Sequence, residues 1–329
     1  MNKYIRIASV AAAAAALLCA CSREMAPQVE PEYVDVPFVL SIADEQGDAT
    51  RATTALFPEV ENWIYDYYYV QFIGDASAYT GHMRKTVTTG DLTVTENIKL
   101  RAGANSTVVF VANIVPAGTN YVDSPGWDAT DGSVQILDEN GIPFLADNEN
   151  GVLTLNKFKK LRFNMNNRLV RIQASDNSMK HMPMCGYWQG TVPAPSNDGT
   201  TNTVPATVTM GRMVSRMNVT ITNKTGAAIT QLRMLNASSK AYYFPQTENE
   251  DLAERDYITF TQSANIANNQ SATFYFYTAP NYCQSNGLET TLEFTAGGKK
   301  GTVKLGSDPE AGDYNLYMNT IYTFNVTVK

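Results

Sequence analysis

The sequence contains few of the residues that usually carry metal or acid–base chemistry. It has 2 histidines and 4 cysteines. His82 and His181 lie far apart, and neither has the neighbouring cysteine or carboxylate spacing of a zinc site. A Gly-x-Ser-x-Gly nucleophile motif and a glycine-rich phosphate loop are also missing. We therefore expect a protein without a metal or cofactor and without enzymatic activity.

The charge and the scarcity of helix-forming stretches further narrow the class of protein. The net charge is −7, which argues against a nucleic-acid partner. Beyond the N-terminal segment there are no long amphipathic stretches rich in leucine and alanine, whereas threonine, valine, tyrosine and phenylalanine are plentiful. This composition favours strands, and several segments alternate polar and apolar residues with the period of half-buried strands. The sequence predicts an all-β protein.

The N-terminus has the layout of an export signal. Lys3 and Arg6 precede an apolar run over residues 8–18, which is shorter than the roughly 20 residues of a membrane-spanning helix. The following Leu18-Cys19-Ala20-Cys21 resembles a bacterial lipobox, in which Cys21 becomes the lipidated residue. We expect residues 1–21 to be a lipoprotein signal peptide and the outer membrane to be an early partner through the lipid anchor. An ordinary signal peptide with an incidental cysteine is the alternative.

The rest of the chain is long enough for two domains. A polar stretch rich in threonine, proline, glycine and asparagine breaks the apolar rhythm over residues 189–203. We place the domain boundary there, which gives a pro-segment (22–51), an N-terminal domain (52–195) and a C-terminal domain (196–329). Cys185 and Cys283 could form a disulfide or remain separate thiols.

The first and last predicted strands resemble each other. Each presents four apolar residues at alternate positions, namely Val36, Phe38, Leu40 and Ile42 in the first and Tyr322, Phe324, Val326 and Val328 in the last. A turn-rich stretch after the first strand contains Arg51 and Ala52, a basic site in a loop where proteases cut readily. Cleavage there would free the first strand, and the last strand of a neighbouring molecule could replace it by β-strand addition. The alternative is that both strands are permanent members of their sheets.

The chain also resembles the fimbrillin (type V pilin) family of Bacteroidales. The matching features are the lipobox at Cys21, the site at Arg51 and Ala52, and the segments 181–186 (HMPMCG), 208–217 (VTMGRMVSRM) and 318–328 (MNTIYTFNVTV). The resemblance implies two tandem transthyretin-like β-sandwich domains and delivery to the cell outer membrane as a lipoprotein. It also implies maturation by an arginine-specific, trypsin-like protease and polymerisation with other pilin subunits by donor-strand exchange into an extracellular fimbria.

The resemblance leaves several roles open. A stalk-type subunit is the main hypothesis, with an anchor or tip subunit as alternatives within the same family. A surface glycan-binding lipoprotein is the alternative from a different class, in which Trp63, Trp127 and Trp188 would stack on sugar rings.

Overall fold

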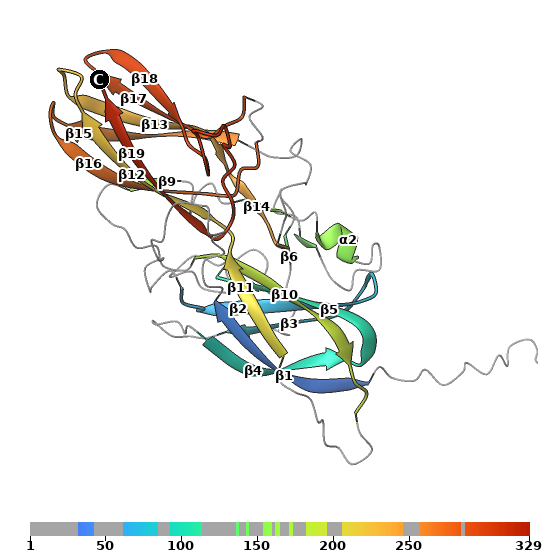
Figure 1. Ribbon diagram of the computed structural model, residues 1–329. Helices are drawn as coiled ribbons and strands as arrows, with labels where there is room; N and C mark the ends of the chain where they lie inside the picture. The colour runs from blue at the N-terminus through green and yellow to red at the C-terminus, as the bar shows by residue number, and fades with distance from the viewer. Residues whose placement is uncertain are drawn as a thin grey trace, which may run out of the picture. The chain divides into compact units, whose positions relative to one another are not determined.

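The computed structural model describes most of the chain from residue 32 to its C-terminus. The described residues are 32–42, 62–84, 93–113, 136–137, 143–144, 154–159, 162–164, 171–173, 182–195, 206–245, 257–283 and 287–329. Nearly all of them form strands (Figure 1), which confirms the predicted all-β class. Over these ranges, no helix has the length and apolar character needed to cross a membrane.

A seven-stranded sheet contains the first strand of the chain. Its order is β3 (Ala76–Arg84), β2 (Asp66–Ile73), β5 (Gly103–Ala112), β10 (Met184–Val192), β11 (Ala206–Arg212), β1 (Tyr33–Ile42) and β4 (Thr93–Arg101). In this order β2 and β4 stand far apart, yet the Tyr69 hydroxyl on β2 donates a hydrogen bond to the Lys99 carbonyl on β4. The sheet therefore curls on itself and encloses an apolar interior.

One interior strand of this sheet, β5, contains a near-continuous apolar run. Residues 106–112 of β5 are all buried, and Val108 to Ala112 have no exposed surface. Because β5 pairs with β2 on one edge and β10 on the other, its backbone is satisfied on both sides. The near-continuous apolar run predicts a strand covered on both faces, and the structure confirms it.

Two four-stranded sheets form the C-terminal half. One has the order β19 (Thr320–Val328), β12 (Ser215–Asn223), β16 (Ser271–Thr278) and β9 (Arg171–Gln173); the other has β15 (Tyr257–Ile266), β13 (Ile229–Ser238), β17 (Thr291–Ala296) and β18 (Lys299–Lys304). Alternate residues of β12 and β13, such as Val219 and Leu232, are fully buried in the same core cluster. This pattern is that of a β-sandwich.

Short elements complete the description. The helix α2 (Leu155–Phe158) is a single turn capped by Thr154, whose hydroxyl accepts a hydrogen bond from the Lys157 amide. Two short ladders join β14 (Lys240–Tyr242) to β8 (Arg162–Asn164) and β6 (Ile136–Leu137) to β7 (Pro143–Phe144).

The chain passes from the seven-stranded sheet to a four-stranded sheet between β11 and β12. Strands β10 and β11 flank residues 196–205 and belong to the same sheet, whereas β12 belongs to another. Met213 and Val214, both buried, connect β11 to β12. A polar, turn-rich stretch marks a connection, but its composition does not distinguish a link within a sheet from a link between domains. The chain thus passes from one sheet to the next at residues 213–214.

Candidate strand-exchange site

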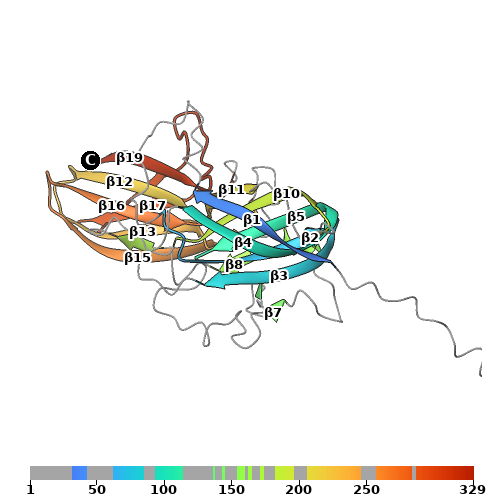
Figure 2. The ribbon, with the colours of Figure 1, turned by 90° about the horizontal axis from the view of Figure 1, so that it is seen from below.

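The first strand of the chain lies inside the seven-stranded sheet. Strand β1 pairs antiparallel with β4 over Tyr33 to Ser41 and parallel with β11 over Phe38 to Ile42. Both views of the ribbon show β1, in blue, beside β4 (Figures 1 and 2). We use the term acceptor groove for the space between β4 and β11 that β1 occupies.

The apolar face of β1 fills the acceptor groove. Val34, Val36, Phe38 and Leu40 are buried at 4% exposure or less, and Ile42 is half-buried. The intervening residues Tyr33 and Asp35 are exposed, as the alternation of a strand requires. The sequence-predicted set Val36, Phe38, Leu40 and Ile42 therefore lies on one face, with Val34 as a fifth member.

Phe38 contacts a cluster of aromatic rings at the centre of the groove. Its ring centroid lies 5.2 Å from that of Phe110 on β5 and 5.6 Å from that of Trp188 on β10, the latter in an edge-to-face arrangement. The rings of Tyr67 and Tyr69 on β2 also lie close to Phe110, at 6.2 and 6.0 Å between centroids. We call the position that the Phe38 ring occupies beside Phe110 and Trp188 the ring pocket, and we call these two residues its walls.

Strand β4 is attached to the rest of the sheet by contacts that do not involve β1. The side-chain oxygen of Gln71 on β2 accepts a hydrogen bond from the Arg101 amide at 2.8 Å, and its nitrogen donates to the Arg101 carbonyl at 2.8 Å. The Tyr69 hydroxyl reaches the Lys99 carbonyl at 3.3 Å. One wall of the acceptor groove is thus held at its C-terminal end without help from the strand that fills it.

The described segment that precedes β2 is anchored as well. Asn113, with a φ of 59°, accepts a hydrogen bond from the Tyr65 amide at 2.8 Å and donates to the Trp63 and Met182 carbonyls. Asn62 accepts a hydrogen bond from the Arg212 guanidinium. The chain from Asn62 onward is therefore tied to the fold by bonds that removal of β1 would not break.

The last strand of the chain lies at the edge of its sheet. Strand β19 pairs parallel with β12 from Thr320 to Val328 and is the terminal strand in the sheet order. Tyr322 and Val328 are buried, and Phe324 and Val326 are half-buried. The residues between them are exposed: Thr323, Asn325 and Thr327. The predicted alternation is confirmed, although Ile321 at the start of the strand is buried on the opposite face.

The base of β19 is clamped to the end of β11. Asn319, at a φ of 55°, donates its amide to the Arg212 and Val214 carbonyls. Its side-chain oxygen accepts hydrogen bonds from the Arg212 amide and guanidinium at 3.1 and 2.6 Å. The Ser215 hydroxyl also donates to the Tyr317 carbonyl at 2.8 Å. β19 therefore begins at a fixed point that is joined to a wall strand of the acceptor groove.

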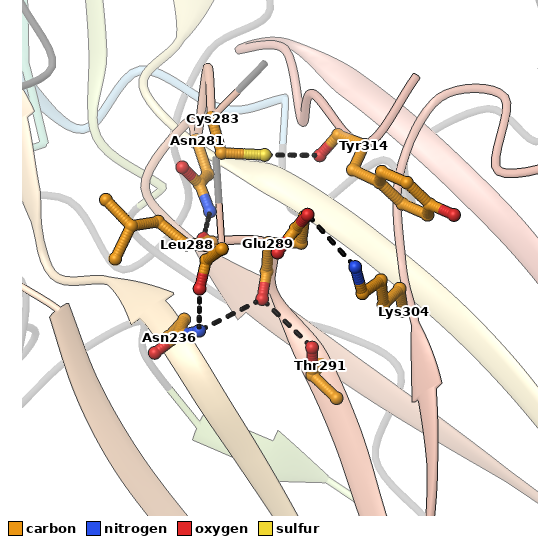
Figure 3. A network of polar contacts seen from close by, with 9 residues as sticks. Asn236, Asn281, Cys283, Leu288, Glu289, Thr291, Lys304 and Tyr314 are labelled. Atoms are coloured by element: carbon orange, nitrogen blue, oxygen red, sulfur yellow. Dashed lines mark hydrogen bonds and ion pairs between the residues drawn. The ribbon is translucent and has the colours of Figure 1, made fainter. Parts of the chain in front are cut away.

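A second polar network holds the chain that leads into this clamp (Figure 3). Asn281 exchanges two backbone hydrogen bonds with Leu316. Its side-chain amide donates to the Leu288 carbonyl at 3.0 Å, and the Cys283 thiol donates to the Tyr314 carbonyl at 3.3 Å. Glu289 binds Lys304 at 3.0 Å. Burial alone would raise the pKa of Glu289, but backbone hydrogen bonds and Lys304 outweigh it and hold the pKa below its usual value. The network is structural, and it fixes the approach to β19.

A comparable ion pair stands on the neighbouring strands. Glu293 of β17 binds Arg233 at 2.8 Å and Lys300 at 3.1 Å. Burial acts to raise the pKa of Glu293, whereas Lys300 and Arg233 lower it by more, so that the carboxylate stays charged at neutral pH.

Several sequence-predicted residues lie outside the described part of the chain: Cys21, Arg51, Ala52, Trp127 and His181. Trp63 and Trp188 are half-buried and pack edge-to-face against Tyr65 and Phe38, so both serve as packing residues. Cys185 and Cys283 are buried thiols that are not joined in a disulfide. Burial raises the pKa of Cys185 to about 12. Across the described ranges, histidine, cysteine and carboxylate side chains do not gather in threes at a metal-binding distance.

Comparison with known proteins identifies solved structures of a similar fold. No protein-family model and no curated protein matches the sequence. The tip fimbrial protein Mfa3 from Porphyromonas gingivalis matches with a TM-score of 0.51 and 13% identity, over 90% of this chain and 95% of its own. A candidate cell adhesion protein from Bacteroides eggerthii gives 0.53 and 15%, over 89% and 86%, and one from Parabacteroides distasonis gives 0.52 and 13%, over 88% of each chain.

These similarities establish a shared fold. They confirm, at the level of the fold, the resemblance to the fimbrillin family that the sequence motifs indicate. All three similar proteins are described as fimbrial or cell adhesion proteins.

Proposed function

We propose that this protein is a structural, stalk-type subunit of a cell-surface fimbria. It is exported as a lipoprotein, cleaved after Arg51 and polymerised by donor-strand exchange. The observation that carries the proposal is the position of the two terminal strands. β1 fills a groove between two other strands, and β19 lies at a sheet edge with the same alternation of apolar residues. The removable strand comes before the cleavage site, and the donor strand comes last.

The backbone pairing favours the exchange. In its own molecule, β19 is paired along one edge only, with β12. In the acceptor groove of a neighbour it would pair with β11 along one edge and with β4 along the other, as β1 does. Each additional backbone hydrogen bond contributes about 0.5–1.5 kcal/mol net. Transfer therefore replaces one ladder with two.

The burial of side chains also favours the strand exchange. Phe324 and Val326 are half-buried in their own sheet, whereas the groove positions Phe38 and Leu40 are 1% exposed. Filling an empty groove with four large apolar side chains contributes roughly 6–12 kcal/mol, before ordering costs and before the burial that Tyr322 and Val328 lose in their own sheet. Since the uncut chain fills its own groove, assembly waits for cleavage. Since donor and acceptor surfaces differ, the contact is head-to-tail and grows a filament.

The strands beside the acceptor groove are held in place by hydrogen bonds that do not involve β1. Gln71 and Tyr69 keep β4 attached to β2, and Asn113 keeps the segment before β2 attached. Cleavage after Arg51 would thus release one strand and leave the rest of the sheet held in place.

A stalk role requires both an acceptor groove and a donor strand on each molecule. An anchor would retain β1, and a tip would use its groove but no donor strand. Immunogold labelling of fimbriae distinguishes these roles: a stalk subunit labels the whole length, and an anchor or tip labels one end.

Limited digestion of the purified precursor tests the proposal. An arginine-specific protease should cut after Arg51, release residues 22–51 and produce oligomer ladders that survive mild detergent. The matched control Arg51→Ala should stay uncut there and monomeric. A native chain that is cut cleanly, loses the segment and yet remains monomeric at high concentration contradicts the assignment.

A further inference from the structure

The acceptor groove contains one position that accommodates an aromatic ring. Phe38 lies between Phe110 and Trp188, whereas the other buried groove positions are filled by aliphatic side chains. A smaller side chain at this position would leave a cavity, because protein interiors are closely packed. The occupant of this position therefore sets which register of an entering strand is stable.

The geometry of the groove leaves few registers. The direction of an entering strand is fixed if it pairs as β1 does, parallel with β11 and antiparallel with β4. Its apolar face must point inward, so that registers differ by steps of two residues, because a shift of one would turn that face to solvent.

We propose that the C-terminal strand of a second copy enters with Phe324 in the ring pocket of Phe38; this inference rests on the proposed strand exchange. Tyr322 then takes the position of Val36. Val326 takes that of Leu40, and Val328 takes that of Ile42. Every groove position from 36 to 42 receives an apolar side chain, and the ring pocket receives a ring of the same size.

Both neighbouring registers fit less well. A shift by one step places Val326 in the ring pocket and leaves a cavity between the walls. A shift the other way places Tyr322 there, with its hydroxyl against the rings of Phe110 and Trp188, whereas Thr320 takes a buried position in either register, that of Val34 or that of Val36. Burying an unpaired hydroxyl is unfavourable.

The clamp at the base of β19 agrees with the same register. The 9 residues of β19 then cover positions 34–42, and Asn319 falls at the position of Tyr33, the first and exposed residue of β1. The whole strand enters the groove, and none of the hydrogen bonds between Asn319 and Arg212 must break. A deeper register would pull the clamp into the groove.

Cysteine crosslinking reads this register directly. Val39 lies opposite Thr95 of β4, so that Asn325 should lie opposite Thr95 in the assembled filament. Both side chains are exposed, and substitution there leaves the core intact. Directly opposed antiparallel residues lie about 4.5–5.5 Å apart between Cα atoms, within the range of a disulfide.

The chain with Thr95→Cys and Asn325→Cys is cleaved, assembled and oxidised. We expect a reductant-sensitive ladder on denaturing gels. The matched controls combine Thr95→Cys with Thr323→Cys or Thr327→Cys, which report the two neighbouring registers and should give no ladder. The native chain controls for Cys185 and Cys283. The uncut precursor should give no ladder, because its own β1 fills the acceptor groove and the C-terminal strand of a second copy cannot lie beside β4.

The outcomes separate the register from the function. A ladder with the cysteine at 323 or 327 overturns the register and leaves strand exchange intact. Filaments without a ladder in any variant show that another segment lies beside β4, which overturns both. If the native chain forms no filaments after cleavage, the proposed function fails first.

A second measurement uses the donor side chains. Phe324→Ala should raise the protein concentration required for assembly by at least about tenfold, and Val328→Ala by less, since Val328 takes the half-buried position of Ile42. Equal effects of the two substitutions contradict the assignment of Phe324 to the ring pocket.

Discussion

Replacing Phe38 by alanine should destabilise the uncut chain and leave the assembled protein unchanged. The side chain is 1% exposed and its ring lies 5.2 Å from Phe110 and 5.6 Å from Trp188 between centroids. Truncation of a buried phenylalanine removes apolar burial and leaves a cavity, which together cost about 3–5 kcal/mol. We expect the free energy of unfolding of the precursor to fall by that amount.

Urea unfolding followed by tryptophan fluorescence measures this loss. Trp188 contacts the Phe38 ring edge-on, so that its emission reports on the groove. Val39→Ala is the matched control, because Val39 is the next residue of β1 and points to the opposite, half-buried face. It should cost about 1 kcal/mol or less.

Cleavage provides the second half of the test. Residue 38 leaves with the segment 22–51, so that filaments made from the Phe38→Ala precursor should match native filaments in stability. A precursor loss below about 1 kcal/mol refutes the packing argument. A filament defect that persists after complete cleavage refutes the removal of β1.

Three further predictions concern the supports of the groove and the C-terminal sheets. Asn319→Ala should lower the stability of the uncut chain by about 2 kcal/mol, because it removes buried hydrogen bonds and places alanine at a φ of 55°. Asn319→Gly, which accepts that φ, should lose about 1 kcal/mol less in the same urea titration. Gln71→Leu should cost about 1–3 kcal/mol and speed amide exchange in β4, because it leaves the Arg101 backbone without its partners; unchanged exchange would show that β4 is held otherwise. Glu293→Gln should destabilise the protein at pH 7 and progressively less as the pH falls below 4.5, as unfolding titrations at a series of pH values measure. The folded-state pKa of Glu293 lies below the ordinary 4.5, so its contribution is present above that value and is lost as the pH falls through the folded pKa.

The sequence predicts the strands that have a strong internal pattern. The apolar run of β5 indicates a strand covered on both faces, and the alternation in β1 and β19 indicates one apolar face on each. These properties depend on neighbouring residues alone, which is why the sequence reveals them.

The pairing of those strands is not visible in the sequence. Nothing local to β1 indicates that it runs parallel to β11 and antiparallel to β4, because pairing joins residues far apart in the chain. For the same reason the polar stretch before β11 suggests a domain boundary, although both of its flanking strands lie in one sheet.

The supporting polar residues were also missed. Gln71, Asn113, Arg212 and Asn319 are single polar residues in ordinary surroundings, and burial alone gives them their structural role. A signal exists only for Asn319, which directly precedes the last alternating strand, where a tight turn is required. Composition alone does not tell a packed tryptophan from an exposed one, and the half-buried positions of Trp63 and Trp188 follow from their pairing with Tyr65 and Phe38.

The position of one strand in the assembled filament tests the central claim most directly. A cryo-electron microscopy map of filaments grown from the cleaved protein would show which segment lies between β4 and β11. The account predicts residues 320–328 of the neighbouring molecule, with Phe324 between Phe110 and Trp188. Density for residues 33–42 of the same molecule at that place would contradict it.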